Sequence, residues 1–302
     1  MHTRAGGGAY TVTKHNLGEK LSLLAGGALL VDYTLTVAVS ISSGADAFIA
    51  AFPVLYHHKV LIACLLVAVI LILNLRGLTD SAAVLAYPVY LFIFGMIIVI
   101  GIGTFKVATG QAAPHIHAQA GTMVSGVTVF LLLRAFSSGA SSLTGIEAIS
   151  NAVMSFKSPA PKNAVKTLIA MGTILALMLV GIVGLSYWYG IVPKVQTTVL
   201  SQLAMHVLGQ NAAFYFIQAT TVLILILAAN TGFTAFPMLA ANMAQDKYMP
   251  HMFTVRGDRL GYSNSMIILG SIAIILIIVF KGQTESLIPL YATGVFLSLI
   301  HI

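Results

Sequence analysis

Charged side chains are scarce in this sequence. Only 8 % of the 302 residues are Asp, Glu, Lys or Arg, whereas 58 % are hydrophobic and the mean hydropathy is +0.97. In a typical soluble domain about a quarter of the residues are charged, so this composition excludes an ordinary soluble domain. The sequence therefore predicts a polytopic membrane protein, with one transmembrane domain over residues 1–302 and no soluble domain.

Several chemical motifs are missing as well. The single cysteine, Cys64, excludes a disulfide within the chain and a cysteine-based metal site. There is no G-x-x-x-x-G-K-[ST] loop for a nucleotide, no HExxH pair for zinc and no TVGYG-like filter of a potassium channel. Nor can a serine, histidine and acid be grouped for hydrolysis. We expect neither an enzyme nor a resident metal or cofactor.

Apolar runs indicate about eight membrane-spanning helices. The runs cover residues 21–51, 60–75, 83–105, 127–156, 164–191, 212–244, 265–280 and 287–300. Of the fifteen Lys and Arg residues, ten fall on the side that holds the N-terminus and four on the other side. Because cytoplasmic loops carry the excess of basic residues, we expect a multi-pass protein of the cell membrane with a cytoplasmic N-terminus.

The fourth run, which centres on residues 130–154, is interrupted by small and polar residues. They are Ser137, Ser138, Gly139, Ser141, Ser142, Thr144 and Gly145, followed by the acid Glu147. Non-helical backbone survives in a membrane only where protein or a wet cavity surrounds it, because each unpaired group costs several kcal/mol. We interpret the run as a helix broken near residues 137–145, at a binding site. A continuous helix that uses small residues for close packing is the alternative, but it does not explain Glu147.

A second acid lies inside the first run. Asp32, Tyr33, Thr36 and Ser40 form a polar stripe along one side of a helix. Hydroxyl and carboxylate oxygens are the ligands that a partly dehydrated hard cation needs. The stripe is a candidate cation site. The alternative is a hydrogen-bonded patch between helices, with Asp32 neutral or paired with Arg134.

Two further polar features lie in later runs. Asn230, Thr231 and Thr234 precede Pro237, and the sequence leaves open whether they bind an ion or compensate for a kink at the proline. Tyr291 lies in the last run, where a tyrosine is either a packing residue or a ligand near a pathway.

Four segments resemble the amino acid–polyamine–organocation (APC) superfamily of secondary transporters. They are GGGAY, VDYTLTVAVS with its flanks, TGIEAISN, and the stretch from AANTGFTAF to RGDRLGYSN. Within the superfamily, the chain resembles most the KimA-type potassium importers. The resemblance implies an all-α, partial LeuT-like inverted-repeat (5+5) fold that works by alternating access. Counted in this way, the first two helices and the last ones are absent, so we expect a chain that is incomplete at both ends.

The resemblance also assigns roles to residues. The positions associated with potassium coordination or the pathway are Asp32, Tyr33, Thr36, Ser40 and Tyr291. Glu147 matches a carboxylate associated with the coupling proton, and the backbone of the broken helix is represented by Ser138, Gly139, Ser142 and Gly145. These assignments imply a proton-coupled potassium importer, with potassium, a proton and the bilayer as partners and a homodimer as the full-length state.

Two other functions remain open at this point. An amino-acid or polyamine permease of the same fold would hold the charged ends of its substrate with the broken helix, and would not need a carboxylate at Asp32. A membrane sensor or scaffold that transports nothing would tolerate neutralisation of both Asp32 and Glu147.

Overall fold

The computed structural model describes residues 8–77, 82–111, 128–140, 156–194, 197–255 and 262–299. Within these ranges the regular elements are helices, and no strand longer than an isolated bridge occurs. The α-helices are α1 (Gly8–Leu17), α2 (Glu19–Ala51), α3 (Lys59–Leu75), α4 (Ala82–Ala108), α5 (Val129–Ala140), α7 (Ala160–Trp188), α8 (Val199–Leu208), α9 (Ala212–Gln245), α10 (Ser263–Val279) and α11 (Thr284–Leu299). Two 3₁₀ helices, η1 (Pro53–His58) and η4 (His251–Phe253), join some of them.

The helices follow the predicted apolar runs. Among the described residues, five segments are long and apolar enough to cross a membrane: α2, η1 with α3, α4, α7 and α9. Helix α10 is apolar but shorter, α5 lies within the fourth predicted run, and α11 overlaps most of the last one. The prediction of an all-α, multi-pass membrane protein is confirmed. Helices α1 and α8 were not predicted, because ten residues are too few to give a spanning signal.

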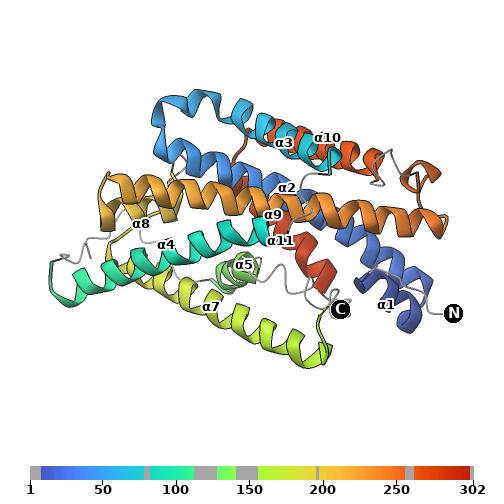
Figure 1. Cartoon of the computed structure of the whole chain (residues 1–302), viewed down its shortest axis with the longest axis horizontal. Coiled ribbons are helices and arrows are strands. Elements are labelled where there is room, and N and C mark those ends of the chain that lie inside the picture. The colour runs from blue at the N-terminus through green and yellow to red at the C-terminus, as the bar shows by residue number, and fades with distance from the viewer. Residues whose placement is uncertain are drawn as a thin grey trace.

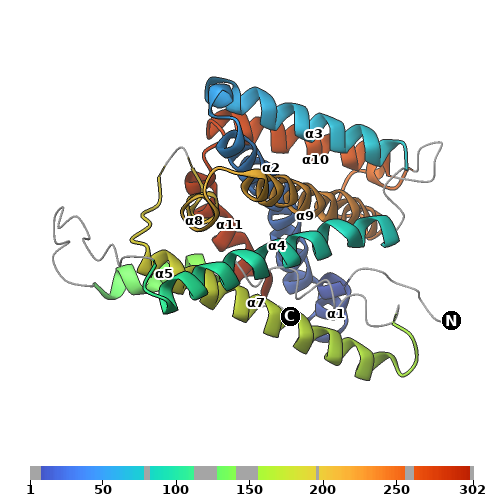
Figure 2. The ribbon, with the colours of Figure 1, turned by 60° about the vertical axis from the view of Figure 1, so that its left-hand side comes forward.

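Three layers make up the bundle, as Figures 1 and 2 show from two sides. Helices α3 and α10 form one outer layer, α2 and α9 form the middle layer, and α4 and α7 form the other outer layer. In the first two layers, one helix comes from the first half of the chain and its neighbour from the second half. This arrangement is compatible with the inverted repeat that the family resemblance implies.

Close packing of α2 against α9 holds the middle layer together. At Gly232 of α9, an added Cβ would lie 2.6 Å from Val37 Cγ2 and 3.0 Å from the Tyr33 carbonyl oxygen. Only glycine allows the two backbones to come this near. In a membrane the hydrophobic effect does not press helices together, so van der Waals contact at short range supplies much of the attraction.

The main core fills the space between α2, α3, α9 and α10. Ile41 of α2, Val67 of α3, Phe233 of α9 and Leu269 of α10 are fully buried there. By contrast, the outward face of α7 leaves its large apolar side chains exposed. An apolar exterior of this kind fits hydrocarbon around the bundle, not water.

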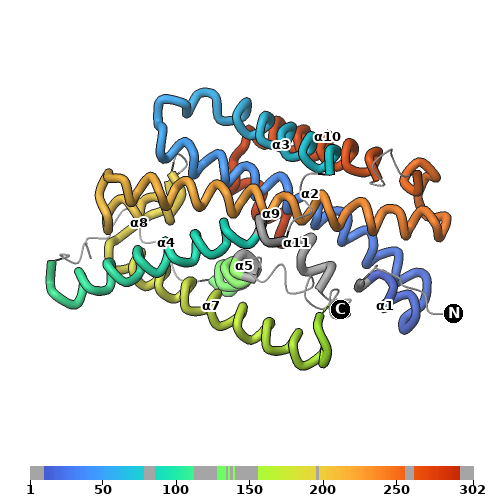
Figure 3. Tube along the Cα trace, viewed as in Figure 1, coloured from blue at the N-terminus to red at the C-terminus, as the bar shows by residue number. Residues whose placement is uncertain are grey.

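Helix α1 lies beside the start of α2 and the end of α9 (Figure 3). Its Tyr10 is buried and donates a hydrogen bond to Asp246 Oδ2 at 2.7 Å, and Lys14 Nζ lies 2.7 Å from the same oxygen. Burial raises the pKa of Asp246, but the hydrogen bonds from Lys14 and Tyr10 outweigh it, so the pKa lies below its ordinary value of 3.8. The ionised carboxylate thus fastens α1 to the end of α9.

Replacing Gly232 by alanine tests the α2–α9 contact. We expect Gly232→Ala to destabilise the purified protein by about 1–3 kcal/mol, a fall of several degrees in Tm, because the new methyl group overlaps Val37 and the Tyr33 backbone. Gly101→Ala on α4 is the matched control, since its Cβ would meet nothing within 4 Å. Equal Tm values for the two variants in a thermal melt would contradict the close approach.

Acid should release α1 from α9. Because the folded pKa of Asp246 is depressed, its contact stabilises the docked state above pH 3.8 and is lost as pH falls through the lower, folded pKa. Spin labels at the exposed His15 and His251, in a chain without Cys64, would report the α1–η4 distance. We expect the distance to lengthen and broaden only below about pH 4. In Asp246→Asn, this acid transition should be absent, and a transition that persists there would disprove the role of Asp246.

Candidate functional site

The polar stripe predicted on α2 faces the interior of the protein. Asp32 is 2 % exposed and Ser40 is 8 % exposed, while Tyr33 and Thr36 are half-buried. Asp32, Thr36 and Ser40 follow one another at four-residue intervals, so they share one side of the helix. The stripe therefore points toward neighbouring helices rather than toward lipid.

Helix α11 brings Tyr291 to this stripe. The Thr36 hydroxyl donates a hydrogen bond to Tyr291 Oη at 3.4 Å, across 255 positions of sequence. Tyr291 is buried and packs against Leu35 of α2. At 3.4 Å the hydrogen bond is weak, but it shows that Thr36 and Tyr291, which were predicted separately, are in contact. The space between α2 and α11 is accordingly the centre of the candidate site.

The predicted broken helix is described only in part. Ser138 and Gly139 lie on α5, and α5 packs against α11, the helix that carries Tyr291. Ser142, Gly145 and Glu147 lie outside the described residues, as does the side chain of Arg134. The break in the helix and the role of Glu147 stay predictions.

The cluster on α9 makes contacts within the helix and with α3. Asn74 Nδ2 donates a hydrogen bond to Asn230 Oδ1 at 2.7 Å, and both residues are buried. The Thr231 hydroxyl bonds the Ala228 carbonyl, and the Thr234 hydroxyl bonds the Asn230 carbonyl. The carbonyl that Pro237 leaves without its usual donor is that of the residue four positions earlier, Phe233, so Thr234 does not repair it. These contacts favour a link between helices for Asn230, and ion binding by the cluster stays a prediction.

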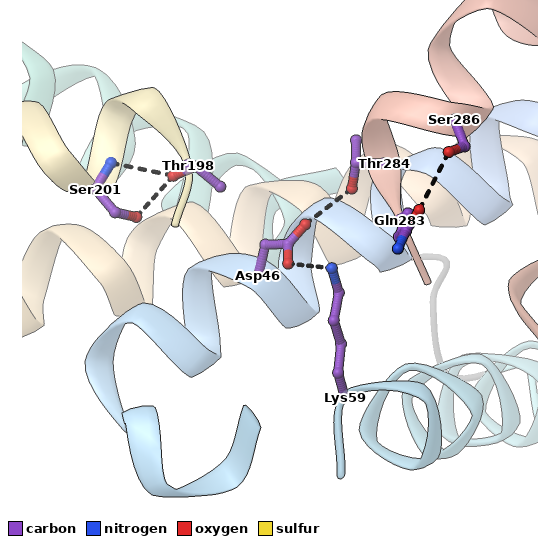
Figure 4. Close-up of polar contacts among 7 residues, drawn as sticks. All are labelled: Asp46, Lys59, Thr198, Ser201, Gln283, Thr284 and Ser286. Atoms are coloured by element: carbon purple, nitrogen blue, oxygen red, sulfur yellow. Dashed lines mark hydrogen bonds and ion pairs between the residues drawn. The ribbon is translucent and has the colours of Figure 1, made fainter. Parts of the chain in front are cut away.

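Sequence reasoning missed a second polar group, near the far end of α2. Lys59 Nζ lies 2.5 Å from Asp46 Oδ1, and the Thr284 hydroxyl donates a hydrogen bond to Asp46 Oδ2 at 2.9 Å (Figure 4). The side chains of Lys59 and Asp46 are only 10 % and 11 % exposed. One carboxylate thus joins α2 to the first residues of α3 and α11.

A cavity of about 590 Å³ adjoins this group. Its wall includes Ser43 and Asp46 of α2, Lys59 of α3 and Thr284 and Ile288 of α11. The connection between α7 and α8 and the first half of α9 close other sides. The cavity lies next to the candidate site along α2 and α11. Ser43 in its wall is about one helical turn from Ser40, and Ile288 is about one turn from Tyr291.

One signal in the sequence could have revealed Asp46. It lies fourteen residues after Asp32 in the same apolar run, which is close to four helical turns and thus nearly the same face. A second acid inside a membrane span is a functional candidate by the same reasoning that selected the first. Its partners could not be found in this way, because Lys59 and Thr284 come from other helices.

Together these features define a class of protein. Buried carboxylate and hydroxyl oxygens lie between membrane-spanning helices, and a cavity stands over them, as expected of a transporter that moves a small polar solute. A family model described as amino acid permease matches residues 3–302. The chain belongs to the amino acid permease family, within the APC superfamily that its motifs resemble.

A particular relative is similar over nearly the whole chain. The chain is 60 % identical over 293 residues to the potassium transporter KimA of Bacillus subtilis (strain 168). The matching region covers 97 % of this chain and 48 % of that protein. The chain thus spans about half the length of the curated relative that it matches.

The Asn74–Asn230 pair can be tested by removing each partner. We expect Asn74→Leu and Asn230→Leu each to lower the free energy of unfolding in detergent by about 1 kcal/mol, because each leaves the other amide buried without this bond. The double variant should lose less than the sum of the two. Thr231→Val is the control, because the exposed Thr231 hydroxyl bonds only its own helix among the contacts described. Full stability of Asn74→Leu would contradict the structural role.

Proposed function

We propose that this chain forms the ion-binding part of a proton-coupled potassium importer of the cell membrane, which works by alternating access. The observation that carries the proposal is the meeting of the Asp32 stripe with Tyr291 between α2 and α11. Identity of 60 % to a protein named as a potassium transporter supports the choice of ion.

The ligands for potassium come from the stripe. A potassium ion that enters the bundle must exchange part of its water shell for protein oxygens. Asp32 supplies a carboxylate, and Tyr33, Thr36, Ser40 and Tyr291 supply hydroxyl oxygens. Because the stripe is buried, the attraction between the ion and Asp32 is much stronger than it would be in water. A zwitterionic amino acid bound by helix ends would not need the carboxylate of Asp32.

Proton coupling is assigned to Glu147. A carboxylate among membrane helices loses hydration, which favours its neutral form and lets it take up and release a proton during a cycle. The backbone of Ser138, Gly139, Ser142 and Gly145 would offer peptide groups beside the ion where the helix is broken. The assignment rests on the sequence and on the resemblance.

The excess of basic residues on one side supports a cytoplasmic N-terminus. Lys14 and Lys20 precede or open α2, and Arg76 follows α3 on the same side of the membrane. In this orientation the cavity beside Asp46 opens toward the outside and α1 lies at the cytoplasmic surface. The complete transporter is proposed to form a homodimer, with each protomer carrying its own site.

Growth on scarce potassium tests this function. A bacterium that lacks its own potassium uptake systems would express the chain alone, or the chain in place of the matching segment of the Bacillus subtilis transporter. We expect rescue by the chimera, and loss of rescue in its Asp32→Asn and Glu147→Gln variants at equal membrane abundance. Thr173→Val on α7 should rescue like the parent, because this exposed hydroxyl lies outside the candidate site and bonds only its own helix among the contacts described.

Uptake assays then distinguish the alternatives. Amino-acid uptake without potassium rescue, from a well-expressed chimera, would replace the importer by a permease. Rescue that survives both acid substitutions would remove Asp32 and Glu147 from the mechanism. An abundant chimera that moves neither solute would favour a sensor or scaffold.

A further inference from the structure

We propose that the cavity beside Asp46 is an outer binding site for a monovalent cation, and that the Lys59 ammonium occupies the place of that cation in the structure. The cation would be held by the Asp46 carboxylate and the Thr284 hydroxyl before it moves on to the Asp32 stripe. The choice of potassium as the cation rests on the proposed function.

The contacts of Lys59 are those of a bound cation. Its ammonium group lies 2.5 Å from Asp46 Oδ1, and the second oxygen of the same carboxylate accepts from Thr284 at 2.9 Å. An ammonium group is a compact monovalent charge that seeks oxygen partners, as a potassium ion does. The carboxylate is therefore already positioned, with one oxygen fixed by Thr284 and the other facing a positive charge.

Helix stability does not explain the position of Lys59. It is the first residue of α3, where the helix dipole disfavours a positive charge. Burying an ion pair also costs desolvation that the mutual attraction often fails to recover. Even so, the protein buries this side chain, which is only 10 % exposed. Because the helix dipole and desolvation both disfavour a buried ammonium group at this position, its presence points to a role for its charge.

The cavity itself suits an ion with part of its water. Its volume of about 590 Å³ exceeds by far the share of one water molecule in the liquid, about 30 Å³. Two carboxylates, Asp46 and Glu285, and two ammonium groups, Lys59 and Lys194, line it. The two negative and two positive charges balance when Lys59 pairs with Asp46. They balance again when a cation takes that place and the Lys59 ammonium group moves out of the cavity into water.

The location connects this cavity to the main site. Asp46 lies ten residues beyond Thr36 on α2, about 15 Å along the helix axis. Thr284 lies seven residues before Tyr291 on α11, the other helix that lines the main site. A cation released from Asp46 toward the interior would pass Ser43 and reach Ser40 along the same helix.

Removing the Lys59 ammonium group should leave a position beside Asp46 that potassium can occupy. We expect potassium chloride, compared with choline chloride at equal ionic strength, to raise the Tm of the purified Lys59→Met chain by about 3 °C more than that of the parent. Lys59→Gln keeps a neutral donor for Asp46 and should show the same extra shift even if Lys59→Met folds poorly. Lys194→Met is the matched control, since it removes a charge from the same wall but not the partner of Asp46.

The outcomes separate this site from the proposed function. The extra shift should vanish in Asp46→Asn/Lys59→Met and persist in Asp32→Asn/Lys59→Met, because the second pair alters only the inner stripe. An equal shift in Lys194→Met, or no extra shift in either Lys59 variant, would overturn the outer site. The Tm measurement needs no transport. A chimera that fails to import potassium would therefore contradict the proposed function without affecting the test of the outer site.

Discussion

The contact between α2 and α9 at Gly232 is the constraint on which the rest of the fold depends. Helix α2 carries both the Asp32 stripe and Asp46, and α9 is followed directly by Asp246, which contacts Tyr10 and Lys14 of α1. With no side chain at Gly232, the helices approach until the Val37 methyl and the Tyr33 carbonyl touch the α9 backbone. Most other helices are placed relative to this pair, because α1, α3, α4, α8, α10 and α11 all pack against α2 or α9.

Several buried polar groups of the bundle make contacts across helix boundaries. The amide pair Asn74–Asn230 joins α3 to α9, the Thr36–Tyr291 contact joins α2 to α11, and Asp46 joins three helix segments. In hydrocarbon a polar side chain without a partner is costly, so each such group also specifies which helix must lie beside it. Thr36, Tyr291 and Asp46, which belong to the proposed ion sites, therefore also help to specify helix register.

The sequence predicted the helices well because hydropathy depends on local composition, and the apolar runs match the described helices closely. It also selected Asp32, Thr36 and Tyr291, two of which the structure brings into contact. It could not identify the partners of Asp46, since Lys59 and Thr284 belong to other segments and only folding brings them together. Nor could it place Asn74, which looks like an isolated polar residue at the end of an apolar run. The roles of Glu147 and its neighbours remain predictions, as those residues lie outside the described ranges.

Two ionic ties lie at opposite ends of the middle layer, Lys14 with Asp246 at one end and Lys59 with Asp46 at the other. Gly232 meets Tyr33 and Val37 between them, near the midpoint of α2. Around this point the two helices interlock, with Ile41 of α2 and Phe233 of α9 in the same buried core. A tilt of α2 against α9 about Gly232 would carry the Asp46 end of α2 and its α1 end in opposite directions, and it would have to repack that core on both sides of the glycine.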